Sequence, residues 1–165
     1  MTNSRKAIFL DRDGVINKEH KDYVKNIDEL EVFSDIVNPL KLLQQNEFLL
    51  IVITNQSAIN RGLTTVTSVN EIHNKIQNFL NGFSLFIDEF YICPHRPDEN
   101  CDCRKPKPGL ILRATKEHSI DLSKSWMIGD NQSDITAASL SGCKGLLIDE
   151  KFRLDDAVQY ILEKS

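Results

Sequence analysis

Short apolar runs alternate along the chain with longer stretches whose apolar residues follow a helical period. The apolar runs have the length of strands and lie at Ala7–Leu10, Phe48–Ile53, Phe86–Ile92, Ser125–Ile128 and Gly145–Ile148. The intervening stretches repeat apolar residues at the spacing of one helix face. These stripes lie within residues 36–43, 69–80, 110–114, 135–140 and 154–162. Such alternation predicts an α/β fold with a mostly parallel sheet and right-handed crossovers.

Local signals predict where some of these helices begin and end. Ser68 and Glu71 have the spacing of a capping box, which predicts that the second helix starts there. Pro108 is of a type favoured in a first turn, and Gly142 of a type favoured after a last turn. His73 and His118 fall in helical segments with no partner nearby in sequence, so we expect both at the surface.

Length, net charge and the lack of long apolar runs limit the domain count and the partners of the chain. Its 165 residues, without repeat or Gly/Ser-rich linker, predict a single domain over residues 1–165. A net charge of −4 gives no general attraction to nucleic acid or to anionic membrane. Met1–Lys6 lacks the apolar segment of a secretory signal, and no apolar run is long enough to cross a bilayer. We therefore expect a cytoplasmic monomer that binds neither nucleic acid nor membrane.

Acidic residues follow two of the predicted strands directly. Asp11 and Asp13 come after the first strand, and Asp130 follows the fourth, with Asp134 on the next turn. Ligands bind at the carboxyl ends of parallel strands. Asp11, Asp13 and Asp130 at this edge would repel one another unless a cation lay among them. Hard oxygen ligands that share an ion with a phosphate favour Mg²⁺. The structural alternatives are a solvated turn and, for Asp130 or Asp134, a helix N-cap.

Further polar groups are expected at the same edge. The second strand ends in Thr54-Asn55-Gln56-Ser57, whose hydroxyls and amides can donate hydrogen bonds to an oxyanion. A capped loop is the alternative for this stretch. Lys105 can add a positive charge.

A cluster of thiols and an imidazole predicts a second metal site. Cys93, His95, Cys101 and Cys103 match a closed tetrahedral Zn²⁺ site, which leaves no position open for catalysis. We expect this structural zinc to order the loop that carries Arg104 and Lys105. A redox pair or chance clustering is the alternative. Cys143 lies apart and is expected to be a small buried residue.

Taken in chain order, four motifs resemble those of the haloacid dehalogenase-like phosphatases. They are Asp11-Arg12-Asp13-Gly14-Val15, Thr54-Asn55-Gln56, Arg104-Lys105-Pro106 and Gly129-Asp130. The zinc loop resembles the branch that holds D-glycero-D-manno-heptose 1,7-bisphosphate phosphatases and histidinol-phosphate phosphatases. The resemblance implies a Rossmann-like three-layer sandwich without a large cap domain, and hydrolysis of a phosphate ester through an aspartyl-phosphate.

The resemblance also implies a role for each motif residue. Asp11 would be the nucleophile and Asp13 the general acid and base, with a pKa raised by neighbouring negative charges. Mg²⁺ would be held by Asp11, the backbone carbonyl of Asp13, and Asp130. Thr54 and Lys105 would bind phosphoryl oxygens, and Arg104 would help to recognise the substrate.

The loop after Asp13 is the best guide to the substrate. Its Glu19, His20 and Tyr23, together with Asn55 and Gln56, suit a substrate rich in hydroxyls and resemble the heptose enzymes. Asn131 departs from those enzymes, which tend to have a basic residue there. We expect a heptose 1,7-bisphosphate, a lipopolysaccharide precursor, to be cleaved at the 7-phosphate.

Other functions predict different features. A histidinol-phosphate phosphatase is the first alternative, and a polynucleotide 3′-phosphatase, which would need a basic surface, is more distant. A non-catalytic relative that binds phosphorylated ligands should have lost Asp11, Asp13 or Lys105. All three are present.

Overall fold

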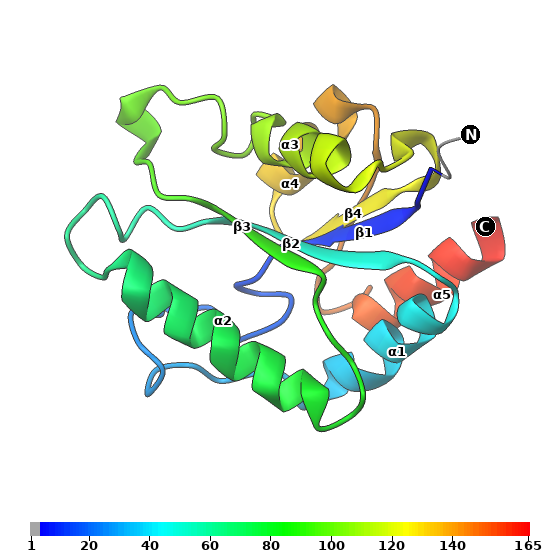
Figure 1. The fold of residues 1–165 in the computed structure, drawn as a ribbon, viewed down its shortest axis with the longest axis horizontal. Coiled ribbons are helices and arrows are strands. Elements are labelled where there is room, and N and C mark those ends of the chain that lie inside the picture. The colour runs from blue at the N-terminus through cyan, green and yellow to red at the C-terminus, as the bar shows by residue number, and fades with distance from the viewer. Residues whose placement is uncertain (1–3) are drawn as a thin grey trace.

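Five parallel strands form one sheet in the computed structural model, which describes residues 4–165 (Figure 1). The strands are β1 (Ala7–Leu10), β2 (Leu49–Asn55), β3 (Glu89–Cys93), β4 (Trp126–Gly129) and β5 (Lys144–Leu147). Their order across the sheet is β3-β2-β1-β4-β5, and every pair is parallel. The chain therefore reverses its direction across the sheet between β1 and β4, a switch point at which ligands bind in this class of fold.

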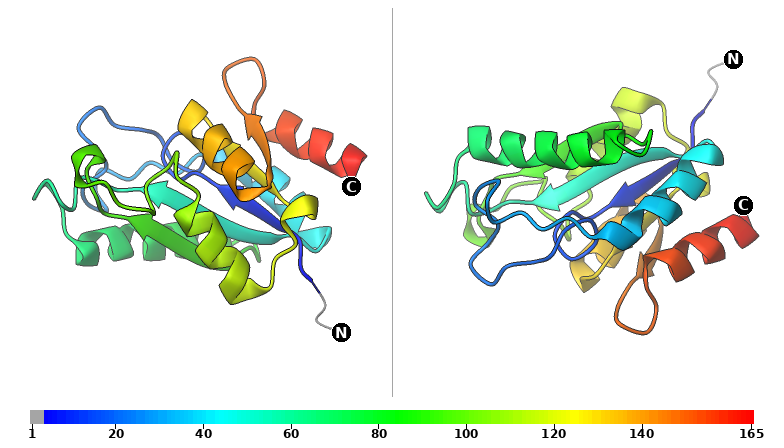
Figure 2. Two further views of the ribbon diagram at one scale, coloured as in Figure 1. Left: turned by 90° about the horizontal axis from the view of Figure 1, so that it is seen from above. Right: turned by 90° about the horizontal axis from the view of Figure 1, so that it is seen from below.

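Helices cover both faces of the sheet. One layer contains α1 (Val37–Gln45), α2 (Val66–Asn81) and α5 (Leu154–Lys164); the other contains α3 (Gly109–His118) and α4 (Gln132–Ser141) (Figures 1 and 2). Short 3-10 turns lie at Ser34–Ile36, Pro97–Glu99 and Leu122–Lys124. The predicted three-layer α/β sandwich is confirmed.

Two apolar cores explain why the strands are apolar throughout. Ile8 and Leu10 of β1 pack with the layer of α1, α2 and α5, whereas Ala7 and Phe9 pack with the layer of α3 and α4. Successive side chains of a strand point to opposite faces, so a sheet covered on both sides needs apolar residues at every position. Cys143 is buried in the second core, as predicted.

Two predicted boundaries differ from the structure by three residues, and the other strand ends by no more than two. The third strand begins at Glu89 and not at Phe86, because Leu85 and Ile87 reach the core from the connection before the ladder starts. The second helix begins at Val66, one turn before the predicted capping box. Thr65 is its N-cap, and the Thr65 hydroxyl accepts from the Ser68 N–H at 3.1 Å.

The expectation for His73 is wrong. His73 is only 5% exposed, because it lies on the apolar stripe of α2, four residues after Val69 and three before Ile76. His118 is half-buried, with its ring edge-on to the Tyr91 ring.

Two expectations concern the first residues of the chain and its relation to membranes. Residues 1–3 lie outside the described residues, so the Met1–Lys6 segment is described only from Ser4 onward. No helix within residues 4–165 is long and apolar enough to cross a membrane. No inserted domain interrupts these residues; a loop over residues 11–33 connects β1 to the 3-10 turn before α1.

Candidate active site

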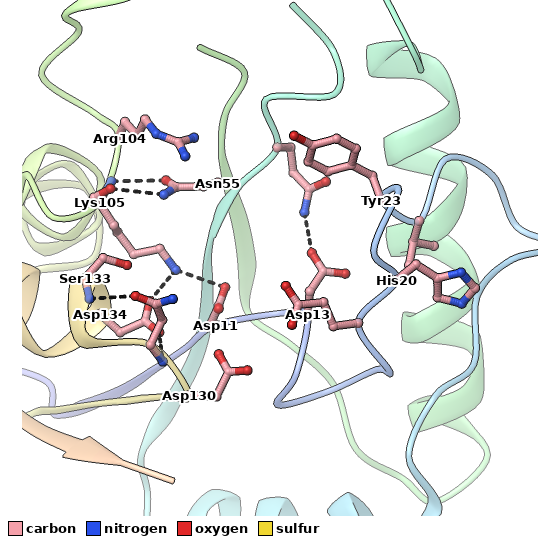
Figure 3. A pocket seen from close by; sticks show the side chains of 14 residues that line it. Asp11, Asp13, His20, Tyr23, Asn55, Arg104, Lys105, Asp130, Ser133 and Asp134 are labelled. Atoms are coloured by element: carbon pink, nitrogen blue, oxygen red, sulfur yellow. Dashed lines mark hydrogen bonds and ion pairs between the residues drawn. The ribbon is translucent and has the colours of Figure 1, made fainter. Parts of the chain in front are cut away.

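Polar side chains converge on a cavity of about 220 Å³ at the carboxyl ends of β1, β2 and β4 (Figure 3). The structure brings almost all the predicted site residues to this cavity. The lining comprises Asp11, Asp13, Glu19, His20, Tyr23, Val24, Asn55, Gln56, Arg104, Lys105, Asp130, Asn131, Ser133 and Asp134. Among the residues predicted for catalysis, substrate binding and Mg²⁺ binding, Thr54 does not line the cavity.

Lys105 connects the acidic groups of the site. Its Nζ lies 2.9 Å from Asp11 Oδ1 and 2.6 Å from Asp134 Oδ1, and it donates to the Ile53 carbonyl at 2.8 Å. Burial disfavours the charge of Lys105, but the two carboxylates outweigh burial and raise its pKa. Lys105 therefore remains a buried cation beside Asp11.

The acids around Lys105 fit a divalent cation. Asp11, Asp130 and Asp134 each place an oxygen within 4.8 Å of the others. Burial raises the pKa of Asp11 to about 7, and the charges of Asp134 and Asp13 add to this effect while Lys105 opposes it. Partial burial, followed by the charges of Asp134 and Glu19, raises the pKa of Asp130 to about 6. Mg²⁺ binding would offset both the burial of these carboxylates and the repulsion between them.

Asp13 has a different environment from Asp11. Its Oδ1 accepts from Arg12 Nη2 at 2.9 Å and Asn17 Nδ2 at 3.0 Å, and its Oδ2 accepts from Gln56 Nε2 at 2.9 Å. Burial favours the protonated form, but the charge of Arg12 and these hydrogen bonds outweigh it and lower the pKa of Asp13. The expectation of a raised pKa is wrong for this structure, because donors and not acids surround the carboxylate.

The second motif positions other residues. Thr54 is buried, and its Oγ1 accepts from Gln56 Nε2 at 2.8 Å. Both ends of the Asn55 amide bind the Lys105 backbone: Oδ1 accepts from the Lys105 N–H at 3.0 Å, and Nδ2 donates to its carbonyl at 3.1 Å. Gln56 thus holds Asp13 and Asn55 holds Lys105, while direct contact of Thr54 with a phosphoryl group stays a prediction.

Asp134 takes a larger part in the site than the sequence suggested. Asn131 is the N-cap of α4, since its Oδ1 accepts from the Ser133 N–H at 3.0 Å. Asp134 Oδ2 accepts in return from the Asn131 N–H at 3.1 Å, which completes a capping box. The same fully buried carboxylate pairs with Lys105. The Asn131-x-x-Asp134 spacing is a sequence signal for the cap, but the ion pair requires the fold.

The side chains predicted to recognise substrate surround the opening. His20 and Tyr23 lie on the Asp13 side of the cavity, and Arg104 lies on the side of Lys105 and Asn55 (Figure 3). Tyr23 has a φ of +67°, a left-handed conformation that is uncommon outside glycine and clusters at functional sites. Its hydroxyl accepts from Ser57 Oγ at 3.4 Å.

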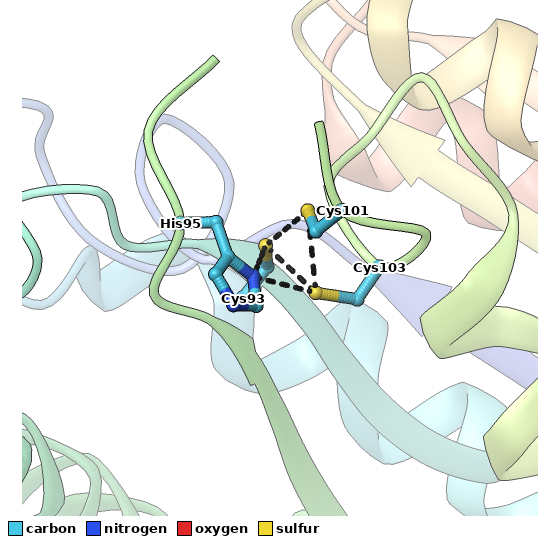
Figure 4. A group of neighbouring side chains, drawn as sticks. All are labelled: Cys93, His95, Cys101 and Cys103. Carbon is cyan, nitrogen blue, oxygen red and sulfur yellow. Dashed lines mark hydrogen bonds between the residues drawn. The ribbon is translucent and has the colours of Figure 1, made fainter. Parts of the chain in front are cut away.

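The four predicted zinc ligands form one cluster (Figure 4). The Cys93, Cys101 and Cys103 Sγ atoms are 3.0–3.6 Å apart, and His95 Nδ1 lies 3.4 Å from Cys93 Sγ and 3.2 Å from Cys103 Sγ. A tetrahedral zinc with Zn–S bonds of about 2.3 Å spaces its sulfur ligands by roughly 3.8 Å. The three cysteines of the cluster are free thiols, so together with His95 they can hold zinc.

The cluster is connected directly to the active site. The Arg104 N–H donates to Cys101 Sγ at 3.4 Å, and Arg104 Nη1 donates to the His95 carbonyl at 3.3 Å. Lys105 follows immediately. Order in the thiol cluster therefore fixes the backbone that carries both cations.

Comparison with known proteins agrees with this geometry. A HAD-hydrolase-like family model matches residues 102–161. The D-glycero-β-D-manno-heptose-1,7-bisphosphate 7-phosphatase of Helicobacter pylori strain 26695 is 45% identical over 88% of this chain and 84% of its own. The enzyme of the same name from Pseudomonas aeruginosa is 35% identical over 88% and 82%.

A solved structure adds the fold and a metal. The D,D-heptose 1,7-bisphosphate phosphatase from Bordetella bronchiseptica, complexed with magnesium and phosphate, superposes with a TM-score of 0.89 at 30% identity, covering 97% of this chain and 99% of the other. Identity of this level over most of both chains means that the protein belongs to the HAD-like phosphatases, in the family of the heptose-1,7-bisphosphate 7-phosphatases.

Proposed function

We propose that this protein hydrolyses the 7-phosphate ester of D-glycero-β-D-manno-heptose 1,7-bisphosphate, with Asp11 as the nucleophile. The observation that carries the proposal is the position of Asp11 between the Lys105 cation and the Asp130 carboxylate, two residues before Asp13. The relatives of 35–45% identity bear the name of this reaction. Asp11 lies at the end of β1, where the switch point of the sheet opens the cavity.

The first step transfers the phosphoryl group to Asp11. Within residues 4–165, the Asp11 carboxylate accepts hydrogen bonds from the Arg12 N–H and from Lys105. Both fall on Oδ1, which leaves Oδ2 to attack phosphorus. As the new P–O bond forms, the bond from phosphorus to the C7 oxygen breaks, and Asp13 protonates that oxygen. Lys105 stabilises the charge on the phosphoryl oxygens.

The second step cleaves the aspartyl-phosphate. Asp13, now ionised, takes a proton from a water molecule whose oxygen attacks phosphorus, and Asp11 and inorganic phosphate are released. The lowered pKa of Asp13 in the free site suits this base role. For the acid role, the charge of the bound phosphate beside Asp13 favours uptake of a proton.

Magnesium fits the same site. Asp11, Asp130 and the backbone carbonyl of Asp13 would hold it, and when bound it supplies the positive charge that lets an anionic nucleophile approach an anionic phosphate. The Asp134 carboxylate already pairs with Lys105 and caps α4, so we propose that it positions Lys105 and does not bind the metal.

The polar rim supports a polyol substrate. Glu19, His20 and Tyr23 offer acceptors and donors for sugar hydroxyls, and Arg104 offers a cation for a second phosphate. The proposal includes a monomeric, cytoplasmic enzyme of one domain. The free thiols of the cluster favour a reducing compartment, in which they stay available for metal.

The test is a comparison of kcat/KM for the heptose bisphosphate and for histidinol phosphate, with the products identified by phosphorus NMR. We expect a higher value for the bisphosphate and release of the 7-phosphate. A higher value for histidinol phosphate would overturn the substrate assignment. Asp11→Asn, assayed in parallel, separates turnover at this site from a contaminating phosphatase.

A further inference from the structure

A fully buried arginine lies directly beneath the proposed general acid. Arg12 is 0% exposed, although a guanidinium is always charged and is costly to bury without partners. Its Nη2 donates to Asp13 Oδ1 at 2.9 Å, and its Nη1 lies 3.3 Å from His73 Nε2. Within residues 4–165, its Nε has no hydrogen-bond partner. The orientation of this cation therefore depends on two side chains, Asp13 and His73.

His73 holds the other end of the guanidinium from outside the catalytic motifs. It projects from α2 into the core, and its ring stacks on Phe90 of β3 at a centroid distance of 4.3 Å and an angle of 15°. Because a guanidinium can only donate, His73 Nε2 must accept, which places the ring proton on Nδ1. Burial, followed by the charge of Arg12, lowers the pKa of His73 to about 3, in agreement with a neutral ring.

We propose that His73 is a positioning residue for the reaction: it fixes Arg12, and Arg12 fixes the Asp13 carboxylate toward the leaving oxygen. The proposal rests on the function proposed above. Of the three side chains that donate to Asp13, Asn17 and Gln56 are neutral amides that also bind Lys18 and Thr54. Arg12 provides the charged hydrogen bond, the strongest kind, on a long side chain that needs a second anchor.

The leaving group distinguishes this role from general stability. Asp13 must protonate a departing alkoxide, but a dinitrophenolate departs without a proton. Because kcat/KM reports only the steps through transfer to Asp11, loss of Asp13 alignment should lower it for a sugar phosphate and spare it for dinitrophenyl phosphate. A variant that merely weakens the fold lowers both values alike.

The variants isolate the Nε2 contact. His73→Phe keeps an aromatic ring against Phe90 but removes the acceptor, and His73→Gln returns an acceptor at a similar reach. Ile76→Val, a buried change three residues along α2, is the matched control for packing. A general acid contributes roughly 100- to 10,000-fold, so we expect His73→Phe to lower kcat/KM for the heptose bisphosphate by about tenfold or more.

The expected kcat/KM values for the other combinations of variant and substrate are as follows. With dinitrophenyl phosphate, His73→Phe should stay within about twofold of the wild type. His73→Gln should recover most of the loss in kcat/KM for the sugar phosphate. Ile76→Val should leave kcat/KM unchanged for both substrates. Equal losses on both substrates, or no loss on either, would overturn the proposal.

Two further measurements separate this proposal from the proposed function. Asp13→Asn should show the same contrast between substrates in larger measure; if it lowers both alike, the acid role of Asp13 is wrong and the role of His73 falls with it. If Asp13→Asn gives the contrast and His73→Phe does not, only the role of His73 is wrong. Nitrogen NMR of the wild-type imidazole requires no variant to fold: a proton on Nε2 would overturn the proposal, and a proton on Nδ1 is expected.

Discussion

Gly14→Ala should damage the magnesium site far more than it damages the fold. Gly14 has a φ of +87°, and a Cβ at this position would lie 2.0 Å from Asp130 Oδ2. Since real Cβ atoms essentially never come within 3.0 Å of such a neighbour, the carboxylate has to retreat by about 1 Å. Asp130 ends in an exposed side chain that can move cheaply, so the displacement changes the metal geometry and adds little to the cost of folding.

Gly142 provides a matched control. It has the same φ of +87° at the end of α4, but an added Cβ would meet nothing within 4 Å. Each alanine pays the left-handed backbone strain, about 1–2 kcal/mol. For a chain of 165 residues that corresponds to a fall in Tm of roughly 2–8 °C, similar for the two variants.

The assay is phosphate release against Mg²⁺ concentration, with Tm measured on the same samples. Displaced metal-site groups typically cost about 10- to 100-fold in affinity or activity, so Gly14→Ala should shift half-saturation by about tenfold or more. Gly142→Ala should keep the wild-type response. If both variants keep the wild-type response to Mg²⁺, or both lose it, Asp130 is not displaced in the way expected here.

Three other results are expected. Asp11→Asn should abolish phosphate release while the protein stays folded, because an amide forms no acyl-phosphate; substantial turnover would exclude the mechanism. The protein should contain about one zinc ion per chain, and Cys101→Ser should lower both zinc content and activity by loosening Arg104 and Lys105; absence of zinc after purification without chelator would contradict this. The metal-free fold gains stability from protonation of Asp11 and Asp130 as the pH falls through about 7, and loses it as the pH rises, because the folded pKa values exceed the ordinary 3.8. Mg²⁺ should therefore raise Tm more at pH 8 than at pH 5.5, and equal rises would refute the assignment.

The sequence predicts strands well where every residue is apolar and less well where the chain only passes through the core. Ala7–Leu10 coincides with β1 because all four side chains are buried between two helical layers. The predicted third strand started too early, since Ile87 is buried without belonging to the ladder. The predicted start of α2 lies one turn too late because it depends on the spacing of Ser68 and Glu71, whereas the Thr65 hydroxyl caps the helix by accepting from the Ser68 N–H.

Some residues of the candidate site could be predicted from the sequence, and others depend on contacts that only the fold creates. Asp11, Asp13 and Asp130 could be located because each follows a strand whose end the fold determines. The pairing of Lys105 with Asp134 could not, because it depends on how the zinc loop meets α4. His73 looked like a surface residue because its partner, Arg12, lies 61 positions away in the chain.

Two aspartates at the end of one strand are prepared in opposite ways. Asp13 is already held as a carboxylate, because Arg12, Asn17 and Gln56 lower its pKa despite burial. Asp11 has one cation, Lys105, which Asp134 shares, so burial prevails and its pKa rises to about 7. A nucleophile must be ionised, so a second positive charge has to act on Asp11 as Arg12 acts on Asp13. A divalent cation held by Asp11 and Asp130 would supply that charge, and its binding near neutral pH is expected to displace a proton from the site.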